Sequence, residues 1–232
     1  MSEQDILNKK FKLMLGDCHD RIEDLNDESI DLIVFSPPYD SIRDYDGEWS
    51  FDKIKLGKQL YSKIKDGSIC AFIMKDETKD FAKSLSSFKL AVDWCEKCSW
   101  RMFETCIYKR HGKPGKWWSQ RFRVDHEYIF LFLKGDRPKY FNKEFLKIKS
   151  SSAGANYKIT QRKTDGSIEK QQGIKTVSDT KCRGTIWSYA TSNTEANKLK
   201  LKHPATYPDA LVGDIIQCFS KKDDIVLDPS GW

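Results

Sequence analysis

Short apolar runs alternate with amphipathic stretches over the first 100 residues of the chain. The runs at 11–15, 31–35 and 68–74 are rich in β-branched and aromatic residues and are bounded by Gly, Asp or Pro, so they predict strands. An apolar stripe at helical spacing over 54–66 predicts a helix that stops at an Asp-Gly pair, and a second helix is expected over 80–98. This alternation of strand and helix predicts a parallel sheet with crossover helices.

The pattern changes after residue 100. Residues 101–109 and 127–134 predict two strands joined by a loop without a helix, which requires an antiparallel pair, expected at one edge of the sheet. From 140 to 200 the chain is rich in Lys, Ser, Thr and Gly with little periodicity, and we expect a mobile inserted module. An amphipathic helix over 208–219 and a strand over 224–227 then resume the core. The expected organisation is core over 1–139, insert over 140–200 and core again over 201–232.

Charge is distributed unevenly along the 232 residues, whose formal net charge is +6. Residues 140–202 hold 13 Lys and Arg against 5 Asp and Glu, whereas the remainder holds 27 against 29. A local surplus of this size is expected of a surface that meets a polyanion such as nucleic acid. The alternative interpretation is a Lys-rich loop that is simply solvated.

Several classes of protein are not favoured. No apolar run approaches the roughly 18 residues that span a bilayer, and the charged N-terminus has no apolar leader, so we expect a cytoplasmic protein without membrane contact. Seven cysteines, an odd number, indicate reduced thiols. Cys95 and Cys98 form the one C-x-x-C pair, and they lie where Leu85, Phe88 and Val92 recur at helical spacing. We expect packed thiols there and no metal site.

The tetrapeptide Ser36-Pro37-Pro38-Tyr39 follows the predicted strand 31–35 directly. Chemistry in open α/β sheets collects outside the carboxyl ends of the strands. The two prolines make a stiff turn, Ser36 offers an acceptor oxygen, and Tyr39 offers an aromatic face. Acceptors and a stacking ring suit an exocyclic amino group on a planar base. A Pro-Pro turn with a core tyrosine is the structural alternative.

The neighbouring sequence carries a family resemblance. Four segments are involved, in this order: LGDCHDRIEDLNDESIDLIVFSPPYDSIRDYDG, RFRVDHEYIFLFLKG, RGTIWSY and KHPATYPDALVGDIIQCFSKKDDIVLDPSGW. Together the chain resembles the amino-group DNA methyltransferases that use S-adenosylmethionine, in the motif order called the β class. The resemblance covers nearly all of the chain outside 140–180. It implies that the side chain of Ser36 and a carbonyl of Pro37 or Pro38 bind the target amino group, while Tyr39 stacks on a flipped base.

The resemblance also implies residues that bind the cofactor S-adenosylmethionine. Asp17 matches an acidic position near the adenine of the cofactor, and His203 and Pro204 match the segment beside its methionine end. A turn aspartate and a histidine at a helix entry are the alternatives for Asp17 and His203. The start of the Gly-rich cofactor motif is matched by Asp228, Pro229, Ser230 and Gly231.

The chain departs from that cofactor motif, since it lacks the usual Phe after Asp-Pro and reads Trp232 after Gly231. The following helix and the next strand of the family are also missing from the sequence. We therefore expect a truncated chain that alone shows little or no methyl transfer. The alternatives are that another chain supplies the missing piece or that the protein binds the cofactor poorly.

Target recognition is expected from the basic insert and from the loop 110–125. In that loop Lys113, Lys116, Arg121 and Arg123 bracket Trp117 and its neighbour Trp118, which combines charge for phosphates with surface for stacking. Tryptophans packed on the sheet edge are the alternative.

These observations predict an α/β protein with the three-layer, Rossmann-like methyltransferase fold, a mostly parallel sheet and an antiparallel edge pair. The expected function is methyl transfer to cytosine N4 or adenine N6 in double-stranded DNA, with a slight preference for cytosine because of Ser36. A homodimer or an accompanying restriction nuclease would suit such an enzyme. A catalytically silent DNA-binding remnant and a methyltransferase for RNA or protein are the alternative functions.

Overall fold

The computed structural model describes residues 11–37, 52–111, 119–190 and 207–230. The chain divides into two compact units, one made of Met1–Phe141 with Ile186–Trp232 and the other of Asn142–Thr185. We call them the core unit and the insert unit. Among the described residues, no helix has the length and apolar character needed to cross a membrane.

A six-stranded sheet forms the centre of the core unit. Its order is β11 (Ile186–Ala190), β5 (Arg101–His111), β6 (His126–Leu133), β2 (Ile64–Met74), β1 (Ile30–Phe35) and β12 (Val226–Leu227). All neighbours pair in parallel except β6, which is antiparallel to both β5 and β2. This confirms the mostly parallel α/β sheet. The predicted antiparallel pair does not form the edge itself, because β11 adds to β5 in parallel and places β6 inside the sheet.

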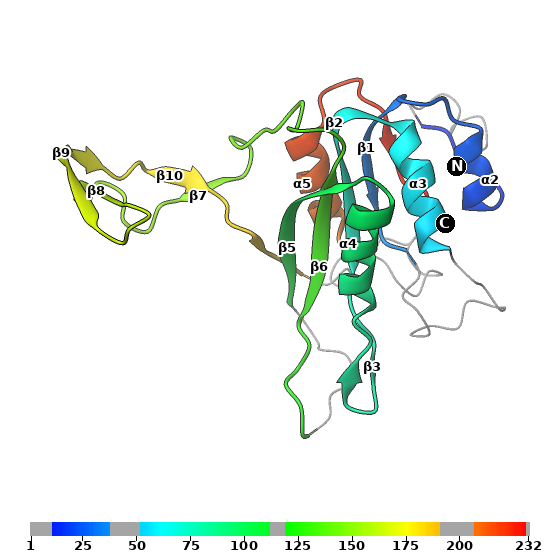
Figure 1. Ribbon diagram of the computed structural model, residues 1–232, viewed down its shortest axis with the longest axis horizontal. Helices are drawn as coiled ribbons and strands as arrows, with labels where there is room; N and C mark the ends of the chain where they lie inside the picture. The colour runs from blue at the N-terminus through cyan, green and yellow to red at the C-terminus, as the bar shows by residue number, and fades with distance from the viewer. Residues whose placement is uncertain (1–10, 38–51, 112–118, 191–206, 231–232) are drawn as a thin grey trace. The chain divides into compact units, whose positions relative to one another are not determined.

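Helices cover both faces of this sheet, which gives the predicted three layers (Figure 1). On one face α3 (Lys53–Lys63) and α4 (Ser86–Lys97) bury Leu60 and Trp94 against Phe72 and other strand side chains. On the other face α5 (Asp209–Phe219) packs against β1 and β2. Every position of β1 is buried, because each face of this strand meets its own helix layer.

Three elements differ from the sequence predictions. Residues 11–15 form no strand, and Leu15 is 99% exposed, while the strand that pairs with β1 on the side away from β2 is β12. The helix α3 passes into β2 at Ile64 without a loop, and Gly67 of the expected stop signal lies within β2 at φ +70°. The helix expected over 80–98 begins later, at Ser86 of α4, because β3 (Thr78–Lys79) and β4 (Ala82–Lys83) form a short hairpin before it.

The packing of α4 also differs from expectation. Cys98 is buried, and its Sγ lies 3.5 Å from the carbonyl oxygen of Ile54, while Cys95 is half-buried. Leu85, Phe88 and Val92, however, are between 45 and 53% exposed, since the buried stripe of the helix is offset from them. That buried stripe consists of Ser87, Leu90, Ala91 and Trp94.

The insert unit consists of two antiparallel strand pairs, although its sequence shows little periodicity. The first pairs β7 (Lys147–Lys149) with β10 (Thr180–Cys182), and the second pairs β8 (Asn156–Arg162) with β9 (Ile168–Thr176). The predicted boundary at 200 differs from the observed end of the unit at Thr185, because Ile186–Ala190 joins the core sheet as β11.

A buried carboxylate holds the start of β1. The Asp31 side chain, 5% exposed, accepts hydrogen bonds from Lys65 Nζ at 2.8 Å, from Lys139 Nζ at 2.6 Å and from the Ile225 amide at 3.0 Å. Burial alone would raise the pKa of Asp31, but these hydrogen bonds outweigh it and lower the pKa from 3.8 to about 2. The carboxylate therefore joins β1, β2 and the residue before β12 in one ionised cluster.

We predict that Asp31→Asn lowers the free energy of unfolding by at least about 2 kcal/mol at pH 7, because the pKa difference between folded and unfolded chains corresponds to that energy. The contribution of the carboxylate is complete above pH 4 or so and is lost as the pH falls towards 2, so the difference between variant and wild type shrinks in that window. Urea unfolding at several pH values measures it. Asp66→Asn, an exposed carboxyl on β2, is the matched control and should cost little.

Candidate active site

The carboxyl ends of β1 and β12 bring together two segments from distant parts of the sequence. Leu32 pairs with Val226 and Ile33 with Leu227, so the residues that follow the two strands lie side by side. Figure 1 shows β1 in blue next to the red end of the chain. The Ser230 hydroxyl donates to the backbone carbonyl of Ser36 at 3.2 Å, across 194 residues of sequence. We call this junction the strand-end site.

Asp228 is the acidic member of the strand-end site. Its carboxylate accepts hydrogen bonds from the Ser230 amide at 2.9 Å, from the Ser230 hydroxyl at 3.1 Å and from the Tyr207 hydroxyl at 3.0 Å. Desolvation by the surrounding groups raises the pKa of Asp228, and the hydrogen bonds from Ser230 and Tyr207 act in the opposite direction. Its described partners are two hydroxyls and one amide, so no cation among them balances the charge.

Tyr207 was not recognised from the sequence. Burial raises the pKa of its phenol, and the nearby Asp228 carboxylate adds to the effect, so the hydroxyl stays protonated and donates to Asp228. The residue stands one position before Pro208, the N-cap of α5. Its place in the sequence, between the His203 motif and α5, could have marked Tyr207 as a candidate site residue.

Asp76 is a second acidic residue that the sequence analysis missed. It follows β2, which is parallel to β1, and is 6% exposed. Its Oδ1 accepts the Ser87 amide at 2.9 Å in the first turn of α4. The rule that selected Ser36, a polar residue after a buried strand, would also have selected Asp76.

Charges of both signs gather around Asp76. Burial lowers the pKa of Lys83, the positive charge of Arg121 lowers it further, and Asp76 acts in the opposite direction. Arg121 is half-buried and Arg123 is exposed, so these two residues of the predicted DNA loop are described. Arg121 and Asp76 both influence the pKa of Lys83, so Arg121 lies near the carboxyl end of β2.

Asp17 has a clear local role. Its carboxylate accepts the His19 amide at 2.7 Å and caps the N-terminus of α2 (Cys18–Glu23). None of the described contacts joins Asp17 to Ser36 or Asp228.

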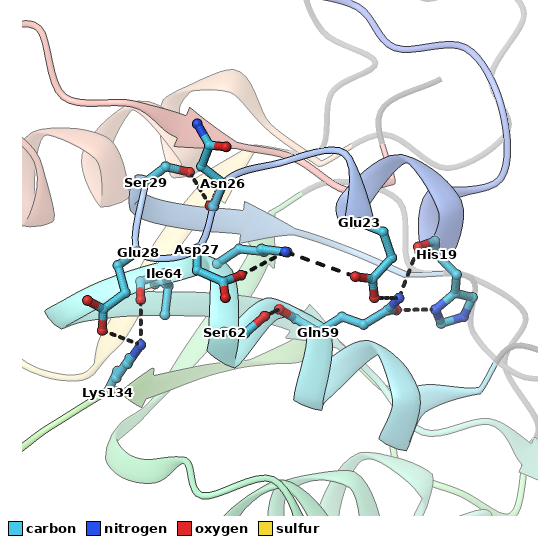
Figure 2. A network of polar contacts seen from close by, with 11 residues as sticks. His19, Glu23, Asn26, Asp27, Glu28, Ser29, Gln59, Ser62, Ile64 and Lys134 are labelled. Atoms are coloured by element: carbon cyan, nitrogen blue, oxygen red, sulfur yellow. Dashed lines mark hydrogen bonds and ion pairs between the residues drawn. The ribbon is translucent and has the colours of Figure 1, made fainter.

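The position of α2 is fixed by a polar network with α3 (Figure 2). The Gln59 side chain lies 2.7 Å from His19 Nδ1, and its amide group donates to the His19 carbonyl at 2.9 Å and to Glu23 at 2.6 Å. The buried Lys63 ammonium binds Asp27 at 2.8 Å in the loop after α2. Asp17 is therefore held at a defined place on the core unit.

The remaining predicted site residues divide into two groups. Pro37 is buried after Ser36, and Pro229 lies between Asp228 and Ser230. The others lie outside the described residues, namely Pro38, Tyr39, Lys113, Lys116, Trp117, His203, Pro204 and Gly231.

Comparison with known proteins identifies the family. The sequence profile described as DNA methylase, covering N6 and N4 methyltransferases, matches residues 30–230. The orphan methyltransferase M.BamHII of Bacillus amyloliquefaciens is 31% identical over 212 residues, which are 89% of this chain and 78% of that protein.

Two solved structures share the fold. The PvuII DNA methyltransferase, which is cytosine-N4-specific, superposes with a TM-score of 0.67 at 17% identity over 92% of this chain and 72% of that one. A DNA modification methylase of Thermus thermophilus, complexed with S-adenosylmethionine, gives 0.53 at 15% identity over 93% and 78%. The matching profile extends from β1 through the strand-end site, so the chain belongs to the DNA methylase family of N6- and N4-amino methyltransferases.

Proposed function

We propose that this protein transfers a methyl group from S-adenosylmethionine to an exocyclic amino nitrogen of a flipped base in duplex DNA, either cytosine N4 or adenine N6. The observation that carries the proposal is the strand-end site, where Ser36 and Asp228–Ser230 meet at the carboxyl ends of neighbouring parallel strands. In open α/β sheets this edge holds the ligand. Family membership supplies the reaction class.

The described residues suit the cofactor. Asp228 is a desolvated carboxylate whose described partners carry no positive charge, so an ammonium group such as that of a methionine moiety would stabilise it. Asp17, at the N-terminus of α2, would contribute an acceptor at the adenosine end. When bound, S-adenosylmethionine supplies an electrophilic methyl group.

The protein side of the reaction is alignment and hydrogen bonding. The Ser36 side chain and a proline carbonyl of the same turn accept the two N–H bonds of the target amino group and turn its lone pair towards the methyl donor. Accepting these bonds also stabilises the positive charge that develops on the nitrogen. After attack the cationic nitrogen loses its surplus proton to water, so no base with a strongly shifted pKa is required. The base must leave the stack, because its amino group cannot otherwise face the donor in line.

DNA binding falls to the basic insert unit and to the loop that carries Arg121 and Arg123. The insert unit holds ten Lys and Arg against four Asp and Glu. Charges of this kind bind the phosphate backbone of any sequence.

Replacing Ser36 by Ala should lower single-turnover methyl transfer by roughly 10²-fold or more, because one acceptor for the reacting amino group is lost. Transfer of radiolabelled methyl groups to DNA measures the rate, and the affinity for S-adenosylmethionine should stay within about twofold of the wild type. Ser188→Ala, an exposed serine of β11, is the control. Equal rates in Ser36→Ala and wild type would contradict the proposed role. Mass spectrometry of the nucleosides then assigns the methylated base.

Replacing Asp228 by Asn should weaken S-adenosylmethionine binding by roughly tenfold or more, because an amide keeps one of the two acceptor oxygens but lacks the charge that attracts the ammonium. Isothermal calorimetry measures the affinity. Asp136→Asn, which removes an exposed carboxylate paired with Arg101 of β5, should leave it unchanged. The proposed cofactor contact is excluded if both variants bind equally well.

Binding of a DNA duplex should weaken by at least about tenfold between roughly 50 and 200 mM salt, since each neutralised phosphate releases counterions. A fluorescence anisotropy titration measures this, with structured RNA and a protein acceptor as competitors. Affinity that does not change with salt, or preferential displacement by RNA or protein, would argue for one of the other substrate classes.

A further inference from the structure

The strand pair β8–β9 of the insert unit lacks an apolar core of its own. No described side chain of either strand is buried, and Ile168 and Ile174 are 60% and 68% exposed. A two-stranded hairpin of this kind is only marginally stable in water unless something packs on it. The exposed isoleucines indicate a surface that a partner covers.

The turn of the hairpin nevertheless fixes its register. Asp165 accepts hydrogen bonds from the Ser167 amide at 2.8 Å and from the Ser167 hydroxyl at 2.6 Å, and Gly166 takes φ +84°. The Lys163 amide donates to the Ser167 carbonyl at 2.8 Å. As a result Arg162 stands directly opposite Ile168, next to the tip.

Strand pairing sorts the side chains onto two faces. Residues directly opposite one another share a face, and successive residues of a strand alternate between faces. One face, which we call the reading face, carries the pairs Asn156–Thr176, Lys158–Ile174 and Arg162–Ile168, with Thr160 between them. The register shifts between Lys158 and Thr160, where β9 has two residues more than β8, and because this number is even the alternation assigns the same residues to each face on both sides of the shift. The opposite face carries the pairs Tyr157–Lys175 and Gln161–Glu169, with Ile159 between them.

Charge separates these two faces. On the reading face the described charged side chains are Lys158 and Arg162, and neither has an ion-pair partner among the described residues. The opposite face carries both Lys175 and Glu169, whose charges are of opposite sign, and Glu169 lies 3.5 Å from Lys163 Nζ. A polyanion is therefore attracted to the reading face more strongly than to the opposite face.

The geometry points to the reading face of β8–β9 as the surface that enters the major groove of DNA and contacts base edges, an inference that rests on the proposed function. The major groove admits a two-stranded β-ribbon. Arg and Lys pair there with the N7 and O6 acceptors of guanine, and apolar groups contact the thymine methyl. The alternation of Arg162 and Lys158 with Ile168 and Ile174 offers both kinds of contact. A protein partner is less well matched, because interface centres are depleted in Lys.

The experiment compares variants that each remove one charge, Arg162→Ala on the reading face and Lys175→Ala on the opposite face. Each chain selects duplexes by binding from a randomised DNA library, and sequencing of the bound duplexes gives the recognised site. Arg162→Ala should relax the site at one or more positions and weaken binding of the wild-type site by roughly tenfold. Lys175→Ala should leave the recognised site unchanged and weaken binding only a few-fold.

A third variant, Ile168→Ala, removes apolar surface without changing charge and should relax a preference for thymine. The substituted positions are all exposed, so thermal unfolding should be unchanged and serves as the folding control. The proposal that the reading face contacts base edges would be overturned if the recognised site were unchanged in both Arg162→Ala and Ile168→Ala. It would also be overturned if Arg162→Ala and Lys175→Ala changed the site and the affinity equally. If the wild type neither binds nor methylates duplex DNA, the proposed function itself fails, and the two failures are thus distinct.

Discussion

The register between β1 and β12 depends on the buried carboxylate of Asp31. Its hydrogen bond from the Ile225 amide, together with the backbone bonds from the Asp31 and Leu32 amides to the Ile225 carbonyl, sets Val226 beside Leu32. A strand of two residues has few ladder bonds of its own to fix its position. Since a shift by one residue would turn every side chain to the other face, the ion cluster at one end of the strands determines what stands at the other end. The hydrogen bond between Ile225 and Asp31 at the start of the strands thus supports the one between Ser230 and Ser36 at their other end.

Sequence patterns were most informative where burial is two-sided. Strands β1, β2 and β6 are buried on both faces and read as continuous apolar runs, so their existence and the sheet class were predictable. The stretch 11–15 is also rich in apolar residues, yet it forms no strand and is mostly exposed. Local sequence cannot decide which short apolar run joins a sheet, since that depends on distant contacts such as the one between Asp31 and Ile225 beside β12.

The site was predictable in part for a related reason. Ser36 and Asp228 could be recognised because each follows a strand and matches a family motif, and the structure brings them together. Tyr207 and Asp76 each had a positional signal, one just before α5 and the other after a buried strand, but the contacts that give them a role, to Asp228 and to the Ser87 amide, are not encoded by any spacing in the sequence. The strand pairs of the insert unit were missed because every described position in β8 and β9 is accessible to solvent, which leaves no hydrophobic alternation to detect.

The separation of Ser36 from Ser230 along the chain has a consequence for biosynthesis. The two residues are 194 positions apart, so a ribosome that adds roughly 5 to 20 residues per second needs about 10 to 40 s to extend the chain from one to the other. During that interval β1 has no β12 beside it, and the groups proposed to hold the methyl donor are not assembled. A nascent chain can therefore fold much of its sheet before it acquires any capacity to modify the DNA of the cell that makes it.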